Sequence, residues 1–223
     1  NVPAGALELL ARRIPARPAA AAARIAQDRE EEKNFLENNG FAVAPYRMLK
    51  SASDCTGIAP ELLPGIVKTA RLGYDGKGQV RVLTEADVAE AFHGLHGRPC
   101  VLEQRVPLAL EISTLVARSA SGQIAVWPLA ENAHRDGILD VSIVPARIPD
   151  SLAARAGAAG MRIAECLDYA GVLCVEMFQT QDGLLLINEI APRPHNSGHW
   201  SIDGSFTSQF EQQCRVLAGL PLG

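Results

Sequence analysis

Residues 172–196 decide the fold, and they read Val-Leu-Cys-Val-Glu-Met-Phe-Gln-Thr-Gln-Asp-Gly-Leu-Leu-Leu-Ile-Asn-Glu-Ile-Ala-Pro-Arg-Pro-His-Asn. Two apolar runs flank Asp182-Gly183, a dipeptide typical of a two-residue hairpin turn in which both turn positions take positive φ. With this pair as the turn, the register places Glu176 directly opposite Glu189. The stretch therefore predicts a β-hairpin that carries two facing carboxylates.

Two carboxylates that face each other across a ladder repel, because their Cβ atoms lie only about 5 Å apart. A sequence that places Glu176 and Glu189 there, among Val, Leu and Ile, needs a positive charge between them. Mg²⁺ bound by the carboxylates and by nucleotide phosphates meets this need. The alternative is a hairpin whose register has slipped by one residue, which would separate the two acids and leave them in solvent.

The composition excludes several classes of protein. The chain has 223 residues, of which 48% are hydrophobic and 21% charged, as in an ordinary globular protein of one or two domains. The net charge of −4, without any block of Lys and Arg, argues against nucleic-acid binding. No apolar run approaches the roughly 20 residues of a membrane span. Five widely spaced cysteines without a Cys-x-x-Cys pair argue against a zinc site or a disulfide framework and favour a reducing cytoplasm.

The rest of the sequence predicts an α+β protein with largely antiparallel sheets. Helical patterns cover residues 4–13, 21–38, 85–96, 151–169 and a last segment whose apolar side is marked by Phe206, Phe210, Cys214 and Leu217. Strands are expected around residues 41–49, 66–68, 80–83, 100–106, 111–117 and 123–128. The charged run 28–33 is interpreted as a solvated helix face.

A glycine-rich segment lies between two predicted strands, at residues 68–79, and reads Lys-Thr-Ala-Arg-Leu-Gly-Tyr-Asp-Gly-Lys-Gly-Gln. Its glycines let a backbone approach phosphate oxygens closely and point N–H groups at them. Lys68 and Lys77 could add positive charge there. It is not a Walker A loop, because no Ser or Thr follows Gly-Lys and no helix is predicted to begin there. We expect a flexible hairpin flap over a nucleotide, with an ordinary mobile hairpin as the alternative.

Acidic residues at strand ends offer further contacts. Glu103 lies near the end of an apolar strand, where it can accept hydrogen bonds from an adenine amino group or from ribose hydroxyls. The alternative is a strand-end acid in water, and Glu111 carries the same ambiguity. Residues 132–137 read as a polar loop with a single histidine, His134.

The segment 192–200, Pro-Arg-Pro-His-Asn-Ser-Gly-His-Trp, comes directly after a predicted buried strand. The two prolines fix the backbone around Arg193 and lower the entropy lost in holding an anion. Arg193, His195 and Asn196 offer planar donors suited to a carboxylate-like or bicarbonate-like oxyanion. So dense a polar run after a buried strand predicts an anion site.

These features resemble the ATP-grasp fold, which combines two glutamates on a hairpin, a strand that ends in lysine and a glycine-rich flap. Within that fold, residues 73–79, 189–200 and 208–211 closely resemble the N5-carboxyaminoimidazole ribonucleotide synthetases, and 27–29 and 220–223 also fit that family's pattern. The resemblance implies an ATP-dependent carboxylate–amine ligase of de novo purine biosynthesis, usually a cytoplasmic homodimer. Such a ligase phosphorylates bicarbonate to carboxyphosphate and carboxylates the exocyclic amine of 5-aminoimidazole ribonucleotide.

The resemblance also implies roles for individual residues. ATP contacts are implied for Arg29, Lys68, Gly73, Tyr74, Asp75, Gly76, Lys77, Gly78, Gln79, Glu103, Gln104, Arg105, Val106, Glu111, His134, Asn188 and Glu189. Mg²⁺ is implied for Glu176 and Glu189, in agreement with the register argument. Tyr74 and Asp75 would contact the aminoimidazole nucleotide. Catalytic roles are implied for Lys77 and for Arg193, His195 and Asn196, which would hold bicarbonate or carboxyphosphate.

The chain departs from that pattern in two ways. Ala191 stands where many ATP-grasp enzymes have an Asn after the second metal glutamate, so the remaining metal ligands must be phosphate or water. We also expect the family's N-terminal nucleotide-fold domain and a C-terminal basic segment to be missing. The predicted domains are a remnant with a connecting helix at 1–40, a lid with the flap at 41–106 and a large domain with the metal and bicarbonate sites at 107–223. The alternatives are a related ligase that activates another small acid, such as formate, and a module that binds nucleotide without turnover.

Overall fold

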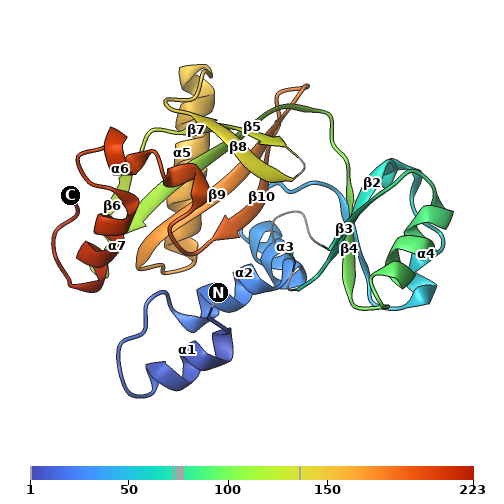
Figure 1. Ribbon diagram of the computed structural model, residues 1–223, viewed down its shortest axis with the longest axis horizontal. Helices are drawn as coiled ribbons and strands as arrows, with labels where there is room; N and C mark the ends of the chain where they lie inside the picture. The colour runs from blue at the N-terminus through green and yellow to red at the C-terminus, as the bar shows by residue number, and fades with distance from the viewer. Residues whose placement is uncertain (1, 72, 74–77, 136) are drawn as a thin grey trace.

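The computed structural model describes residues 2–71, 73, 78–135 and 137–223. The chain folds around two antiparallel sheets that lie at opposite ends of the molecule (Figure 1). Each sheet has its own cluster of buried apolar side chains. The predicted α+β class with antiparallel sheets is confirmed.

The smaller sheet has four strands in the order β1-β4-β2-β3. Its strands are β1 (Tyr46–Leu49), β2 (Gly65–Thr69), β3 (Gln79–Val82) and β4 (Cys100–Gln104), and it packs against helix α4 (Glu85–Gly94) and two short 3-10 turns, Ala52–Cys55 and Pro60–Leu62. Thr84 caps α4 as predicted, because its hydroxyl accepts the N–H of Asp87 while the Asp87 carboxylate accepts the N–H of Thr84.

The larger sheet has the order β10-β9-β5-β7-β8, and β6 pairs with β5. Its strands are β5 (Leu108–Arg118), β6 (Ile124–Val126), β7 (Ala130–Arg135), β8 (Ile138–Ile143), β9 (Gly171–Thr180) and β10 (Leu185–Ala191). The predicted polar loop at 132–137 is wrong, because residues 132–135 belong to β7, where all four pair with β8 and Asn132 also pairs with Glu111 of β5. The partner strand β8 supplies the backbone hydrogen bonds of this segment, whose polar side chains show no strand pattern.

Helices cover the two faces of the larger sheet unequally. Helix α5 (Asp150–Cys166) packs along one face, where Leu152, Ala156 and Ile163 are buried as their helical spacing predicts. On the other face, α6 (Ser201–Gly204) and α7 (Gln209–Leu217) lie at the end remote from the smaller sheet (Figure 1). Val172 and Cys174 of β9 are buried at that end. Because side chains alternate along a strand, Glu176 projects from the same face next in line, beyond the part that α7 covers.

The predicted continuous helix over 21–38 is wrong, because the chain breaks at Asp28. There α2 (Ala20–Gln27) ends and α3 (Arg29–Asn38) begins, after a first helix α1 (Ala4–Ala11). Asp28 is extended, with φ −134°, and its carboxylate accepts the N–H groups of Glu30 and Glu31. An aspartate that caps a helix in this way satisfies donors that would otherwise lack partners.

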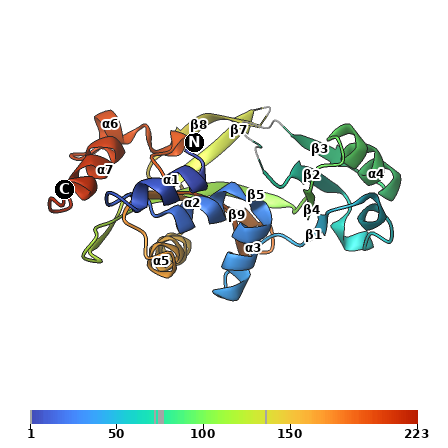
Figure 2. The same cartoon turned by 90° about the horizontal axis from the view of Figure 1, so that it is seen from below.

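The charged run 28–33 was predicted to be a solvated helix face, and this prediction is wrong. Glu32 and Lys33 are each 3% exposed. Helix α3 lies between the two sheets, as both views show (Figures 1 and 2). A helix in that position buries side chains on the sides that face each sheet, so charges there need partners.

The last helix also turns its predicted apolar side outward. Phe206 and Phe210 are 108% and 43% exposed, and the side chains that α7 buries are Gln209, Gln212 and Val216. The buried polar pair is the unexpected feature, because glutamine is seldom fully buried unless its amide has partners. Within the part of the chain that the structure describes, no helix combines the length and the hydrophobicity that crossing a bilayer requires.

Candidate functional site

The β9–β10 hairpin places Glu176 opposite Glu189, as predicted. The turn itself differs from the prediction: the N–H of Thr180 donates to the carbonyl of Leu184 at 3.0 Å, so the loop has three residues rather than two. A bulge at Asn188 then shifts the register by one residue and restores the pairing of the two acids. Bulges of this kind re-aim side chains next to functional sites.

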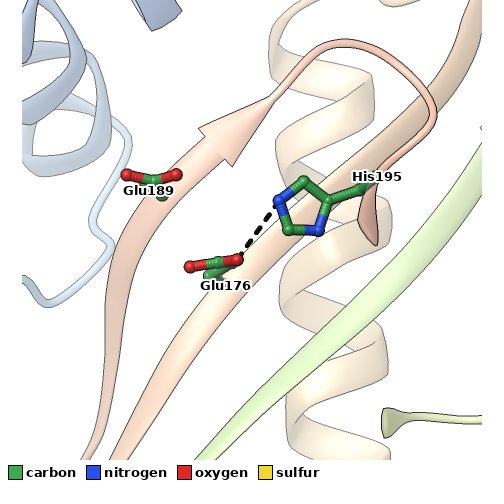
Figure 3. A group of neighbouring side chains, drawn as sticks. All are labelled: Glu176, Glu189 and His195. Carbon is green, nitrogen blue, oxygen red and sulfur yellow. Dashed lines mark ion pairs between the residues drawn. The ribbon is translucent and has the colours of Figure 1, made fainter. Parts of the chain in front are cut away.

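Glu176, Glu189 and His195 form a compact cluster. One ligand atom from each of the three lies within 4.8 Å of the others. Figure 3 shows the two carboxylates on neighbouring strands and the imidazole of His195, which follows β10, turned toward them. The Nε2 of His195 lies 3.3 Å from Oε1 of Glu176. The cluster therefore joins the predicted metal residues to one member of the predicted anion site.

Electrostatics determine the state of this cluster. Burial, and then the nearby charge of Glu189, raise the pKa of the Glu176 carboxyl. Burial, and then Arg193, lower the pKa of His195 to about 4. The contact between them is therefore a neutral imidazole whose Nε2–H donates to Glu176, rather than an ion pair. The Nδ1 atom, 3.0 Å from the Ser197 hydroxyl, is then the acceptor.

The carboxylate pair fits a divalent cation. Burial, and then the charge of Glu189, raise the pKa of the Glu176 carboxyl, so the pair gains from a positive charge between the two acids, and hard carboxylate oxygens are the donors that Mg²⁺ prefers. The amide of Asn188 donates to Oε2 of Glu176 at 3.4 Å, and Nη1 of Arg29 lies 3.7 Å from Glu189. These neighbours hold the two acids facing the same space. His195 offers nitrogen, so Glu176 and Glu189 are the residues that would hold Mg²⁺.

A second charged cluster lies on the smaller sheet. The Nζ of Lys68 is 2.5 Å from one carboxylate oxygen of Glu103, and the Nζ of Lys33 is 3.0 Å from the other. The three side chains are 10%, 5% and 3% exposed. Lys68 and Glu103 are both predicted ATP contacts, so the structure brings that pair together. Sequence reasoning missed Lys33, although it stands four residues after Arg29, on the same side of a helix.

Glu111 and His134 form a third contact, on β5 and β7. The Nδ1 of His134 lies 2.8 Å from Oε2 of Glu111, and this hydrogen bond raises the pKa of the imidazole. Beside them, the buried amide of Asn132 donates to the hydroxyl of Ser113 at 2.9 Å. The sequence analysis did not predict Asn132 or Ser113 as site residues, because Asn132 was assigned to a loop and no local pattern marks either residue.

The remaining predicted site residues lie around these clusters or outside the residues that the structure describes. Arg193 is exposed and donates to the carbonyl of Pro194 at 3.0 Å. Asn196 lines a cavity of about 500 Å³ with Leu139, Asp140, Ser142, His199 and Trp200. Gln104 ends β4, Arg105 and Val106 follow it, and Gln79 begins β3 opposite Lys68. Gly78 has φ +73°. Gly73 is described without regular structure, and Tyr74, Asp75, Gly76 and Lys77 lie outside the described residues.

The sequence and the fold both match known proteins. The pattern of the family described as "ATP-grasp domain" covers residues 34–210. The chain is 46% identical, over 226 residues, to the N5-carboxyaminoimidazole ribonucleotide synthase of Brucella melitensis, a match that covers 100% of this chain and 62% of the relative. The chain therefore spans less than two thirds of that relative's length.

Solved structures agree with the sequence match. The ADP complex of an N5-carboxyaminoimidazole ribonucleotide synthetase superposes with a TM-score of 0.94 at 44% identity, over 100% of this chain and 59% of that one. The Aspergillus clavatus N5-carboxyaminoimidazole synthase, in complex with ADP and 5-aminoimidazole ribonucleotide, superposes with a TM-score of 0.91 at 28% identity, again over 100% and 59% of the two chains. With two antiparallel sheets, a carboxylate pair on a hairpin and this breadth of similarity, the chain belongs to the ATP-grasp family.

Proposed function

We propose that the protein containing this chain uses ATP and bicarbonate to carboxylate the exocyclic amine of 5-aminoimidazole ribonucleotide, releasing ADP and phosphate. The observation that carries the proposal is the Glu176–Glu189–His195 cluster. One ligand atom from each residue lies within 4.8 Å of the others, so a carboxylate pair suited to a metal ion lies beside the loop proposed to bind an anion. A phosphoryl group and a small oxyanion could meet there. The similarity to synthases of this name supports the choice of substrates.

Each group of residues has a part in this proposal. Lys68 and Glu103 of the smaller sheet would contact ATP from one side, and Glu111, His134 and Asn188 from the other. Mg²⁺ held by Glu176 and Glu189 would offset negative charge on the transferring phosphoryl group. Arg193, Asn196 and the neutral His195 would orient bicarbonate by donating hydrogen bonds to its oxygens. Positioning and charge stabilisation would then supply most of the rate enhancement.

The neutral state of His195 matters for this role. Because the pKa of His195 is lowered to about 4, its Nε2–H remains a donor without added charge near neutral pH. Its single N–H cannot serve Glu176 and an oxyanion at once, so it would donate to the incoming oxyanion in place of Glu176, while Arg193 supplies the positive charge. We also propose a homodimer in a reducing cytoplasm. The five cysteines, all free in the structure, support the location.

The first test is ADP release by the intact protein with Mg-ATP, with bicarbonate and 5-aminoimidazole ribonucleotide left out in turn. We expect release only when both are present. Release that ignores the nucleotide would keep the ATP-grasp assignment and show that another acid and amine are joined. ATP binding without any release would show a nucleotide-binding module.

The second test is Glu176→Gln, which keeps the size of the side chain and removes its charge. We expect kcat to fall at least 100-fold, about 2.7 kcal/mol of transition-state stabilisation, because the carboxylate pair can no longer hold the cation. Glu165→Gln, on the exposed side of α5, is the matched control and should keep full activity. Equal activity of the two variants would overturn the metal assignment.

A further inference from the structure

The loop that carries His195 is fastened to the start of helix α7. Gln209, the first residue of that helix, is 0% exposed although it is polar. Its Nε2 donates to the carbonyl of His195 at 2.8 Å, and its Oε1 accepts the N–H of His195 at 2.8 Å. The carboxamide thus satisfies both backbone groups of one residue, as a neighbouring strand would.

A serine adds a second link between the same loop and helix. The Ser201 hydroxyl donates to the carbonyl of Gly198 at 2.6 Å and accepts the N–H of Gln209 at 2.9 Å. The fit is also close in space, because a Cβ added at Gly198 would lie 2.5 Å from Oε1 of Gln209. The loop and the helix can therefore shift little relative to each other while these bonds are intact.

The two ends of the His195 residue are held by different parts of the molecule. Its ring contacts Ser197 through Nδ1 at 3.0 Å and Glu176 through Nε2 at 3.3 Å. Its backbone is held by Gln209. An amide offers a donor and an acceptor on one planar group, which an apolar side chain of equal size lacks, so no such side chain can replace this clamp.

We propose that Gln209 is a positioning residue, which sets the place of the His195 imidazole against the carboxylate pair and thereby the affinity of the loop for the small oxyanion. This inference rests on the proposed function for the identity of the oxyanion. Gln209 contacts neither substrate in this scheme and acts through His195 alone. Its loss should therefore weaken bicarbonate binding more than ATP binding, because most of the predicted ATP contacts lie on other elements.

The test compares Gln209→Met with Gln212→Met in the intact protein. Gln212 lies on the same helix, is 1% exposed and accepts the N–H of Gly223 at 2.9 Å, so it is a matched buried amide that bonds a different segment of the chain. We expect Q209M to raise the KM for bicarbonate at least tenfold and the KM for ATP less than twofold, with Q212M leaving both within twofold. An unchanged bicarbonate KM in Q209M, or the same rise in Q212M, would overturn the proposal.

Two further measurements keep the test independent of folding and of the reaction. Gln209→Asn retains both amide groups on a shorter side chain and should show an intermediate rise in bicarbonate KM if Q209M does not fold. Hydrogen exchange of the peptide over residues 193–199 should be faster in the Gln209 variants than in Q212M. Unaltered exchange would overturn the clamp itself, whereas wild-type ADP release that ignores bicarbonate would overturn only the proposed function.

Discussion

Glu103 shows how one buried acid depends on partners from elsewhere in the chain. Burial by itself would raise the pKa of this carboxyl, but Lys68 and then Lys33 more than offset that effect and lower it from 4.5 to about 2. Both ammonium groups contact the same carboxylate, so the two lysines have a counter-charge only while Glu103 is ionised. A buried group of this kind is costly to disrupt from either side.

Glu103→Gln should lower the free energy of unfolding at pH 7 by about 3–5 kcal/mol, because it leaves two buried ammonium groups without a counter-charge. The native pKa lies below the unfolded one, so the contribution of Glu103 is complete above pH 4.5 and is lost as the pH falls toward 2. The stability gap between wild type and variant should therefore narrow over that window. Urea unfolding at pH 7 and pH 3 measures it, and a gap of constant size would contradict the assignment.

A control variant separates this effect from simple loss of a surface charge. Glu211→Gln breaks an exposed ion pair with Arg215, one helical turn away on α7. Such pairs contribute about 0.5 kcal/mol or less. The control should therefore stay within that amount of wild type at both pH values.

Among the elements, helix α5 approaches strand β5 of the larger sheet tightly at one glycine. A Cβ added at Gly160 would lie 2.4 Å from Cγ2 of Thr114 on β5, whereas one added at Gly157 would meet nothing within 4 Å. Gly160 is therefore required by the approach of helix and strand. Gly157 carries only the usual entropic cost of glycine inside a helix.

We expect alanine substitutions at the two glycines to change the free energy of unfolding in opposite directions. Gly157→Ala should raise the free energy of unfolding by about 0.5–1 kcal/mol, as helix propensity gives. Gly160→Ala should lower it by about 1–3 kcal/mol, because the added methyl group overpacks the contact with β5. Urea unfolding of both variants measures the difference. Two changes of the same sign would show that α5 does not lie against β5 as described.

The β9–β10 hairpin makes a related point about elements. Its turn and its bulge each depart from the simplest two-residue hairpin, and the two departures cancel at the level of Glu176 and Glu189. The pairing of the acids is therefore preserved while Asn188, the extra residue, is turned to reach Glu176. A site can thus keep its register through irregular structure.

For the whole molecule, helix α3 is the link between the two sheets. Lys33 contacts Glu103 on the smaller sheet, and Glu32 accepts the N–H of Ile190, on the larger sheet, at 2.7 Å. Burial, and then Glu189, raise the pKa of Glu32 to about 8. The division of the chain at residues 40 and 106 stays a prediction. The apolar cluster of the larger sheet includes Leu36 and Phe41, on either side of residue 40, whereas the cluster of the smaller sheet lies wholly between Leu49 and Leu102.

Because the predicted ATP contacts are shared by both sheets, Mg-ATP should stabilise the molecule as one unit. At 100 times its dissociation constant, the ligand should raise the free energy of unfolding by about 2.7 kcal/mol. Thermal unfolding should show a single transition that moves upward with Mg-ATP. A second transition that the ligand leaves unmoved would show that the two sheets unfold independently and that ATP contacts only one of them.

The sequence by itself determined the features that depend on near neighbours. These are the hairpin with its two facing acids, the Thr84 cap and the buried side of α5, because periodicity, capping and turn chemistry act over a few residues. The tertiary structure alone decided which polar residues are buried. Glu32 has its partner 158 residues away, and Lys33, Asn132 and Gln209 likewise bond residues on other elements. A polar side chain is buried only where a distant segment supplies its hydrogen bonds, and no local pattern records that segment.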